Sequence, residues 1–452
     1  MDSSKLRIMY SSNAPWCMSG YGVQGKSLLP RLAALPEFGG RQNIAIFAWY
    51  GLHGGIMNYD GFQVYPGAND PYGNDVIGSH AKHFGANVVI SLIDVWVMER
   101  AAAKLKPALW LPWLPIDHQD VPQRVLDCLA GAYLPLTYAK WGHRLLKQAG
   151  VHNHYIPHGV ETSVYRVLPD DDKMAAFKRG VCQIDNAHLT MMVAANKGYP
   201  DRKFFQGQIR AWAAFAKDKP HARLYIHTEP RPIYGGIDFV ELIHGCGIEP
   251  GRVIFPDAYL NLLGFPPEHL AVMYNAADAF LGASMSEGFG IPLIEAQSCG
   301  TPVVTTDFSA MPELVRRGVA VEPLDLFWTP MNSWQAWPDA RGIAAGLEAL
   351  HNEWLAQDRG HSAEARAARY AAQDAIHAEY DWDMIVRDQW QPLVTELAEI
   401  APPLDARFRV AVPTLPAEVK QAPLTPPNVQ QNPVQANGDL HAMGVTRVEV
   451  TP

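Results

Sequence analysis

The segment at residues 286–300 constrains the fold and chemistry of this chain more than any other stretch of its sequence. The apolar run before it, residues 279–281, is typical of a buried parallel strand, and residues 288–290 form a glycine-rich turn. Pro292 suits the first turn of a helix, and Gly300 suits the position just past a helix end. The segment therefore predicts a strand, a glycine loop and a helix whose N–H groups and positive dipole end face a bound anion.

Two carboxylates, Glu287 and Glu295, bracket this turn. Glu287 is expected in the loop, and Glu295 roughly 6–8 Å further on in the helix, at a rise of about 1.5 Å per residue. Carboxylates on either side of an anion site suit a ligand with hydroxyls at both ends and phosphates between, which is the shape of a nucleotide-sugar. The alternative is a purely structural pair. However, Glu295 stands among apolar residues, and a buried carboxylate without hydrogen-bond donors is costly.

Short apolar runs alternate with helical stretches in two successive parts of the chain. Strands separated by helices form parallel sheets, whose ligands bind at the carboxyl ends of the strands. We therefore predict an α/β fold with two doubly wound, Rossmann-like domains. The expected strands are residues 6–10, 44–48, 88–92, 108–111 and 132–136 in the first domain, and 189–193, 223–226, 253–255, 279–281 and 302–305 in the second.

Residues 168–172 form a polar break between the two sets of strands, and their acidic triplet suits a helix N-terminus better than a metal site. Helices are expected at 341–397. From residue 401 the chain is rich in proline and glutamine, a composition that cannot bury enough apolar surface to fold alone, so we predict a disordered tail.

A cationic loop follows the first strand of the second domain. Lys197, Arg202 and Lys203 place three cations within seven residues, at the carboxyl end of a buried strand and before an amphipathic helix. Cations in this position are suited to hold a leaving diphosphate. The alternative is an exposed basic turn.

Two loops of the first domain complete the candidate site. Gly20 and Gly22 follow the first strand and open a helix, where glycines would let a diphosphate approach the backbone, although a tight turn explains them equally well. His118 follows a later strand. An interdomain cleft would place it opposite Glu287, but a single histidine of this kind is more often a hydrogen-bonded loop residue.

The composition limits the class of protein. A chain of 452 residues, 48% hydrophobic and 18% charged, has enough apolar material for at least two cores. Five scattered cysteines argue against a disulfide framework or structural zinc and favour a reducing compartment. Because we find neither a signal segment nor an apolar stretch near eighteen residues, we expect a cytoplasmic protein.

Net charge narrows the choice of partner. The chain carries a net charge of -9, but residues 1–165 hold 13 Lys/Arg against 11 Asp/Glu. This slight positive balance is too weak for nucleic acid and favours a glycan, a lipid-linked sugar or a small molecule as acceptor. A basic, aromatic helix expected at 138–147 leaves peripheral membrane contact open, although a solvated helix face is the favoured explanation.

Three segments carry a resemblance to a known family. Residues 287–304 resemble the donor-site signature of the retaining nucleotide-sugar glycosyltransferases of the two-domain GT-B fold, in particular glycosyltransferase family 4. Residues 156–162 resemble that family's closing segment of the amino-terminal domain, and residues 380–383 resemble the start of its final helix, which crosses back to the first domain. The resemblance spans residues 5 to about 397. It implies two domains facing across a cleft, with an acceptor domain at 1–165, a donor domain at 166–380, a crossing helix at 381–400 and a tail at 401–452.

The resemblance assigns roles on the sugar side of the donor. Glu295 would bind the ribose hydroxyls, Glu287 would contact hydroxyls of the transferred sugar, and His118 would face that sugar. The backbone amides that would bind sugar and phosphate oxygens are those of Gly288, Phe289 and Gly290.

The resemblance also assigns roles on the phosphate side. Lys203, with Arg202 nearby, would neutralise the departing diphosphate, and Gly20 and Gly22 would bring the other domain's backbone against it. Lys197 stands where the family usually has arginine, so a point charge replaces a bidentate group there.

The implied mechanism needs no metal. Departure of the nucleoside diphosphate creates negative charge that cations and helix N-termini stabilise, so no metal or other cofactor is expected beyond the nucleotide-sugar itself. The family resemblance implies front-face attack, in which the diphosphate receives the acceptor proton and Glu287 acts as a binder and electrostatic support. Residues 381–383 resemble a metal motif of the other glycosyltransferase fold, but a helix N-cap is the favoured interpretation. Two alternatives remain, namely a sugar-nucleotide epimerase of the same fold and a non-catalytic nucleotide-sugar-binding subunit.

Overall fold

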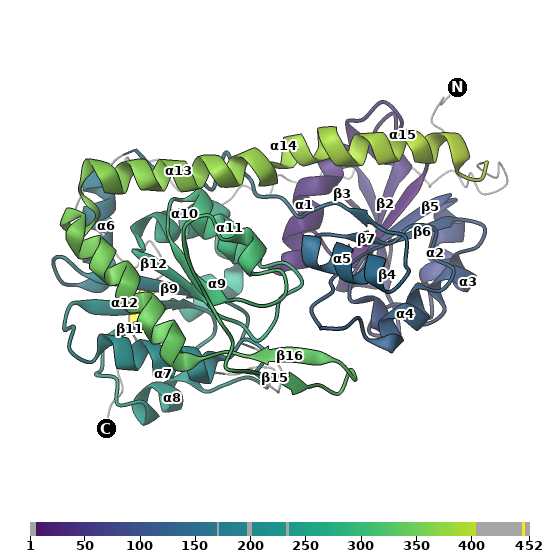
Figure 1. The fold of residues 1–452 in the computed structure, drawn as a ribbon. Helices are drawn as coiled ribbons and strands as arrows, with labels where there is room; N and C mark the ends of the chain where they lie inside the picture. Colours follow the sequence, from purple (N-terminus) through teal and green to yellow (C-terminus); the bar gives the residue numbers. More distant parts are fainter. Residues whose placement is uncertain (1–5, 170, 197–200, 232–234, 404–444, 448–452) are drawn as a thin grey trace.

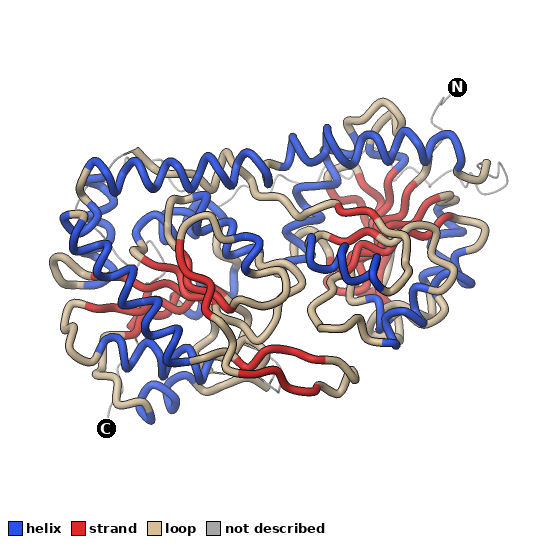
Figure 2. Tube along the Cα trace, in the orientation of Figure 1, coloured by secondary structure: helices blue, strands red, loops and turns tan. Residues whose placement is uncertain are grey.

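Two sheets flanked by helices form the two lobes of the molecule. The computed structural model describes residues 6–169, 171–196, 201–231, 235–403 and 445–447. The lobes lie side by side, and a long helical rod runs along one side of both (Figures 1 and 2). This arrangement is the predicted α/β fold of two doubly wound lobes with a helix that crosses between them.

The first lobe is an eight-stranded sheet in the order β3-β4-β2-β1-β5-β6-β7-β8. Its neighbouring strands are parallel, apart from the antiparallel β3–β4 pair at one edge. The strands are β1 (Ile8–Asn13), β2 (Ile44–His53), β3 (Met57–Tyr59), β4 (Phe62–Gly67), β5 (Val88–Leu92), β6 (Leu109–Leu114), β7 (Leu136–Thr137) and β8 (His154–Tyr155). The helices are α1 (Gly20–Ala33), α2 (Ile77–Phe84), α3 (Ala101–Leu105), α4 (Gln123–Leu129) and α5 (Lys140–Gln148). Strands β1 and β5 are buried along their whole length, as expected of central parallel strands covered on both faces.

The second lobe is a seven-stranded sheet in the order β14-β13-β12-β9-β10-β11-β17. Only β17 runs antiparallel to its neighbour among the described strands of this sheet. The strands are β9 (His188–Val193), β10 (Ala222–His227), β11 (Val253–Pro256), β12 (Ala279–Gly282), β13 (Val303–Thr306), β14 (Gly318–Val321) and β17 (Val445–Arg447). The helices are α6 (Asp171–Cys182), α7 (Phe205–Ala216), α8 (Phe239–Gly245), α9 (Ala258–Leu263), α10 (Pro267–Ala276), α11 (Ile291–Ser298) and α12 (Ala340–Ala356). A separate hairpin, β15 (Asp325–Trp328) and β16 (Trp334–Trp337), leaves this lobe between β14 and α12.

The ten strands predicted from apolar runs all have a counterpart in the structure. The differences concern mainly short strands and strands at or near the edges of the sheets. The strand expected at 132–136 shrinks to the two-residue β7, because residues 132–135 precede the part that pairs with β6. Strands β3, β4, β8 and β14 to β17 were not predicted. Most of them are short or lie at a sheet edge, and such strands lack the continuous apolar run that marks a central strand.

Part of the predicted tail falls outside the described residues, namely 404–444 and 448–452. Within the tail, Val445–Arg447 form β17 and pair with residues 254–256 of β11 at the edge of the second sheet. A composition argument could not indicate this strand, because edge pairing uses backbone groups that every residue type offers.

The rod that joins the lobes consists of α13 (Ala363–Tyr380), α14 (Trp382–Ile385), a π-helical turn (Val386–Trp390) and α15 (Gln391–Ile400). Figure 1 shows α13 along the second lobe and α15 along the first. The buried Trp382 packs on Gly159, where a Cβ would lie 2.6 Å from the indole. Asp381 caps α14 by accepting a hydrogen bond from Met384 N at 3.0 Å, which confirms the N-cap interpretation. Neither this rod nor any other helix in the described part of the chain is long and apolar enough to cross a membrane.

A buried histidine begins the central strand of the second lobe. His188 is fully buried against Phe215, His351 and Trp354. Within the described residues neither of its ring nitrogens has a hydrogen-bond partner. Burial, reinforced by nearby cationic and histidine groups, holds the pKa of His188 well below its usual value. The folded protein therefore keeps this ring neutral, whereas the unfolded chain protonates it.

Acidification should destabilise the wild-type protein more than a His188→Leu variant. Below about pH 6.5, the usual histidine pKa, the unfolded state takes up a proton that the folded state refuses, which lowers the unfolding free energy by up to about 1.4 kcal/mol per pH unit. The measurement is the melting temperature of both proteins from pH 7.5 to 5.5. Equal pH slopes for the two proteins would contradict this role of His188.

Candidate active site

The glycine loop and its helix have the predicted geometry. Strand β12 ends at Gly282, and α11 begins at Ile291 with Pro292 in its first turn. Gly290, with φ of 117°, turns the chain into the helix, and Gly300, with φ of 79°, follows its end. In the described part of the chain, no hydrogen bond uses the N–H groups of residues 288–290. These donors and the N-terminus of α11 are therefore available to an anion.

Glu287 is held by cations from the loop after β9. Its carboxylate lies 2.5 Å from Lys203 Nζ and 3.4 Å from Arg202 Nη1, and Ser284 Oγ donates to it at 2.7 Å. Burial alone would raise the pKa of Glu287, but Lys203 and Arg202 outweigh burial and lower that pKa to about 2. Sequence reasoning thus placed the acid and the two cations correctly at one edge of the sheet. It did not indicate that they pair with one another.

Arg202 also faces carboxylates of the first lobe. Burial, reinforced by Asp117, raises the pKa of Asp94 to about 6, while Arg202 opposes the rise. Burial likewise acts to raise the pKa of Asp117, but His118 and Arg202 bring that pKa below its usual value. Tyr21, in the first turn of α1, donates a hydrogen bond to Asp94 at 3.3 Å. Arg202 therefore lies between acids of both lobes.

Asp94, Asp117 and Tyr21 were absent from the sequence-derived site. Asp94 follows β5 and Asp117 follows β6, so both stand at the carboxyl edge of the first sheet. The rule that ligands bind at this edge could have selected them. Single acidic residues after a strand are common, however, and no spacing connects these residues to the second lobe.

His118 lies beside this cluster and is buried, with 9% exposure. Its Nδ1 is 2.7 Å from Asp117 Oδ1. A carboxylate at this distance favours the proton on Nδ1 and leaves Nε2 as an acceptor. Ser286 Oγ donates to the backbone oxygen of Asp117, so the loop that carries His118 touches the segment that carries Glu287.

Glu295 occupies a different environment from Glu287. It is buried, with 7% exposure, and Tyr274 donates a hydrogen bond to its carboxylate at 3.0 Å. Burial raises the pKa of Glu295 to about 7, against hydrogen bonds from Tyr274 and Tyr165 that lower it. The two glutamates therefore differ in their pKa. Glu287 is ionised beside cations, whereas Glu295, among tyrosines, titrates near pH 7. The donors that a buried carboxylate requires are tyrosine hydroxyls.

Glycines bring the two lobes into contact at the site. A Cβ on Gly288 would lie 2.4 Å from Pro115 Cβ, and a Cβ on Gly20 would lie 3.4 Å from the Ile291 side chain. Gly22 has no room for a side chain, because a Cβ would lie 2.4 Å from the backbone oxygen of Cys17. The first turn of α1 and the first turn of α11 therefore approach across the gap at Gly20, whereas Gly22 serves the tight turn before it, which was the alternative to a diphosphate contact. Lys197 lies outside the described residues.

The helix expected at 138–147 is α5, and its N-terminus binds an acid of the second lobe. The backbone N–H groups of Lys140 and Trp141 donate to Glu313 at 2.7 and 3.0 Å. The Trp141 ring packs on Phe308 at 5.3 Å. This end of α5 is consequently an interlobe contact, a possibility that sequence reasoning did not consider.

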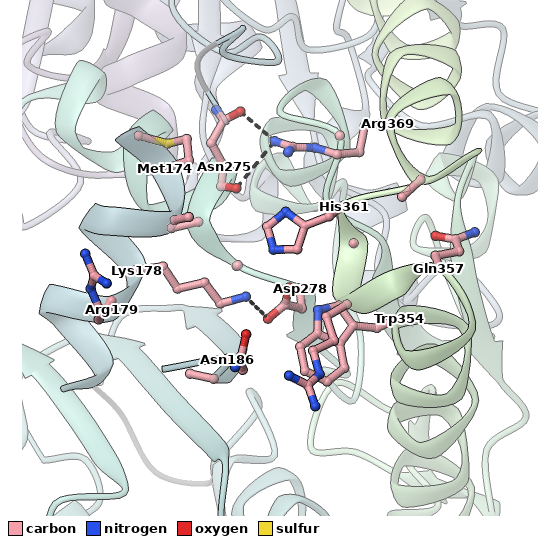
Figure 3. A pocket seen from close by; sticks show the side chains of 18 of the residues that line it. Met174, Lys178, Arg179, Asn186, Asn275, Asp278, Trp354, Gln357, His361 and Arg369 are labelled. Atoms are coloured by element: carbon pink, nitrogen blue, oxygen red, sulfur yellow. Dashed lines mark hydrogen bonds and ion pairs between the residues drawn. The ribbon is translucent and has the colours of Figure 1, made fainter. Parts of the chain in front are cut away.

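A cavity of about 350 Å³ lies elsewhere in the second lobe (Figure 3). It is lined by α6, α12, α13 and the segments that precede β9, β12 and β13. Lys178 pairs there with Asp278, and Arg369 bonds Asn275 at 2.9 Å (Figure 3). The cavity thus stands at the amino edge of the sheet, opposite to Glu287, so position argues against it as the donor site.

Comparison with known proteins supports the predicted two-lobed fold and the resemblance to glycosyltransferases. Residues 258–345 match the family described as "Glycosyl transferases group 1". Sucrose-phosphate synthase from Thermosynechococcus elongatus superimposes with a TM-score of 0.65 and 16% identity, over 87% of this chain and 100% of that one. The chain has the GT-B fold. Anabaena HepE, solved with UDP and glucose, shares this fold with a TM-score of 0.60 and 15% identity, over 86% of this chain and 100% of that one.

Curated relatives match over short segments. O-antigen chain mannosyltransferase B of Escherichia coli is 37% identical over 98 residues, which are 20% of this chain and 26% of the relative. A D-inositol 3-phosphate glycosyltransferase of Rhodococcus erythropolis is 48% identical over 79 residues, 18% of this chain and 16% of the relative. The chain thus spans about a quarter or less of the relatives' lengths. The resemblance to GT-B glycosyltransferases is confirmed, whereas membership of family 4 stays a prediction.

Replacing Lys203 by Met should lower the unfolding free energy by about 1–3 kcal/mol, because Glu287 would lose its nearest cation in a largely buried site. The double variant Lys203→Met/Glu287→Gln, which removes both charges, should recover part of this loss. Chemical denaturation of the wild type, both single variants and the double variant gives the coupling energy. Strictly additive effects would contradict the ion pair.

Proposed function

We propose that this chain is a retaining, metal-independent glycosyltransferase that moves a hexose-type sugar from a nucleoside-diphosphate sugar to a hydroxyl acceptor. The observation that carries the proposal is the Arg202–Lys203 pair beside Glu287 at the carboxyl edge of the second sheet. Free N–H donors at residues 288–290 and the N-termini of α1 and α11 adjoin it. Such donors stabilise an anion, and a departing diphosphate is an anion.

The departing diphosphate would replace Glu287 as the partner of Lys203 and Arg202. Lys203 and Arg202 would turn toward the diphosphate, while Gly20 and Gly22 let the backbone of α1 approach it. Glu287, which these cations keep ionised before the donor binds, would then accept hydrogen bonds from hydroxyls of the transferred sugar. No metal is needed in this scheme, because the cations and N–H groups stabilise the negative charge as it develops on the departing diphosphate.

We propose front-face attack, as the family resemblance implies. The acceptor hydroxyl would approach on the side of the departing diphosphate, whose oxygen takes the proton. His118, with Nδ1 held by Asp117, would present Nε2 as an acceptor for a sugar hydroxyl. Glu287 then supports the developing positive charge without forming a covalent bond.

Glu295 is the candidate for ribose binding. A ribose offers two adjacent hydroxyls, and an ionised carboxylate accepts from both. Tyr274 donates to the same carboxylate at 3.0 Å and would keep it oriented. Because the pKa of Glu295 is about 7 without ligand, binding would coincide with loss of its proton near neutral pH.

The comparisons support a nucleotide-sugar donor. The Anabaena neighbour contains UDP and glucose, and one curated relative is called a mannosyltransferase. We propose a glycan, a lipid-linked sugar or a small molecule as the acceptor. We propose a cytoplasmic location, which the scattered spacing of the five cysteines in the sequence favours.

Thermal shift with UDP-, GDP-, ADP- and TDP-sugars should identify one nucleotide series, because a ligand at a hundred times its dissociation constant adds about 2.7 kcal/mol. With that donor, Lys203→Ala should reduce nucleoside diphosphate release at least about 100-fold, the cost of losing one charge-stabilising donor. The exposed Lys217, changed to Ala, is the matched control and should have no effect.

Three results would count against transfer. If none of the four series stabilises the protein, a nucleotide-sugar donor is contradicted. If Lys203→Ala releases nucleoside diphosphate as fast as the wild type, the leaving-group role of Lys203 is contradicted. Conversion of the donor to an epimer without diphosphate release would identify the epimerase alternative instead.

Affinity for the nucleotide-sugar should rise with pH up to about 7 and then level off. Below pH 7 the Glu295 carboxyl is protonated and can no longer accept from both ribose hydroxyls, which costs up to about tenfold in affinity per pH unit. Nucleotide-sugars suit this test because their diphosphate does not titrate in the range. Isothermal titration from pH 6 to 8 should show this slope for the wild type and a clearly smaller slope for Glu295→Gln, in which Asp94 still titrates near pH 6. The same slope in both proteins would contradict ribose binding by Glu295.

A further inference from the structure

The hairpin formed by β15 and β16 is an element that the proposed donor chemistry does not use. It leaves the second lobe between β14 and α12, and the two strands pair from Asp325–Trp337 to Trp328–Trp334. Figures 1 and 2 show it extending beyond the helices of the second lobe toward the first. A projecting hairpin needs contacts on its flanks to hold one position.

The base of the hairpin is fixed to the segments that carry the candidate site. Ala336 N donates to the backbone oxygen of Met285 at 3.3 Å, two residues before Glu287. The Trp337 ring packs edge-on against Phe204 at 5.7 Å, and Phe204 directly follows Lys203. The hairpin therefore shares its support with the acid and the cation of the site.

The other end of the hairpin is fixed to the first lobe. Gln119 and Trp334 exchange two backbone hydrogen bonds, of 2.9 and 2.7 Å, and Ser333 Oγ donates to the backbone oxygen of Asp120. Met331, in the turn, packs against the core of the first lobe. Because Gln119 follows His118, the hairpin spans the gap between the lobes directly beside the candidate site.

The hairpin has three exposed tryptophans, Trp328, Trp334 and Trp337, and the first two of them lie opposite each other. Trp328 is 55% exposed and Trp334 is 41% exposed. They are cross-strand partners whose rings meet nearly at right angles, with centroids 4.9 Å apart. Exposed aromatic pairs that a scaffold holds rigidly mark binding surfaces, since they offer a large apolar area at little cost in side-chain entropy.

The charge of the hairpin indicates the chemistry of its ligand. Of residues 325–337, only Asp325 is charged, and the turn exposes the neutral amide residue Asn332. A surface for an anionic lipid or a nucleic acid would need cations, and this segment has none. Exposed aromatic faces in an uncharged segment with a neutral amide suit the apolar face and hydroxyls of a sugar ring.

We propose that Trp328 and Trp334 form a stacking platform for a saccharide unit of the acceptor. Trp334 pairs with Gln119, the residue after His118, so the platform would hold a unit beyond the one that receives the transferred sugar. This inference rests on the proposed function, because it assigns the acceptor of the same site to the oligosaccharide class.

Titration of the full-length protein with maltotriose, cellotriose and mannotriose, each to about 10 mM, tests the platform at concentrations that saturate a millimolar site. At least one trisaccharide should bind more tightly than the methyl glycoside of its monosaccharide. Trp328→Ala should weaken that binding about tenfold. Trp328→Tyr, which keeps an aromatic ring, should remain within about threefold of the wild type.

A matched control comes from Tyr370, an exposed aromatic residue on α13. Tyr370→Ala should bind the trisaccharide as the wild type does. Melting temperatures of all variants show whether each is folded. The platform is refuted if no trisaccharide binds the wild type, or if a folded Trp328→Ala binds as well as the wild type. Trp328-dependent binding to phosphatidylglycerol vesicles without trisaccharide binding would also refute it and assign the hairpin to a membrane.

The platform and the proposed function can fail separately. Binding of UDP- and GDP-sugars to the wild type is measured in the absence of trisaccharide. If a trisaccharide binds through Trp328 but no nucleotide-sugar binds, the platform stands and the transferase proposal falls. If a nucleotide-sugar binds and no trisaccharide does, the transferase proposal stands and the acceptor lacks this contact.

Discussion

The charge cluster around Arg202 and Lys203 is the interaction on which the account of this protein depends. These cations satisfy the largely buried Glu287 in their own lobe, and Arg202 also faces Asp94 and Asp117 of the other lobe. Charges kept partly out of water are costly unless they are paired, so the cluster favours approach of the two lobes. An incoming diphosphate can bind the same cations by displacing the carboxylate of Glu287.

The fold creates this cluster by placing the carboxyl edges of two sheets opposite each other. Gly288 and Gly20 let the loops of the two lobes approach within contact distance. Trp382 packs on Gly159 and so fixes the helical rod to the first lobe. The hairpin adds a second bridge at Gln119 and Trp334. A site assembled in this way depends on lobe geometry as much as on the identity of its side chains.

The sequence predicted the parts of the site that lie on one local unit. Residues 286–300 have strand, turn and helix signals that act within a few positions, and the loop after β9 adds its cations in the same way. Sequence could not indicate that Glu287 binds Lys203, that Glu295 lies among tyrosines, or that Asp94 and Asp117 face Arg202, because these contacts join residues far apart in the chain. The hairpin was missed because four-residue strands with several tryptophans have no distinctive period. Domain limits at 165 and 380 stay predictions.

The most direct test of the central claim is a structure of the protein with a bound nucleoside diphosphate. The account predicts that the diphosphate contacts Lys203, Arg202 and the N-terminus of α11, and that the Lys203–Glu287 ion pair has opened to admit it. A diphosphate bound beside Lys178 in the cavity at the opposite edge of the sheet, with Lys203 still paired to Glu287, would contradict it.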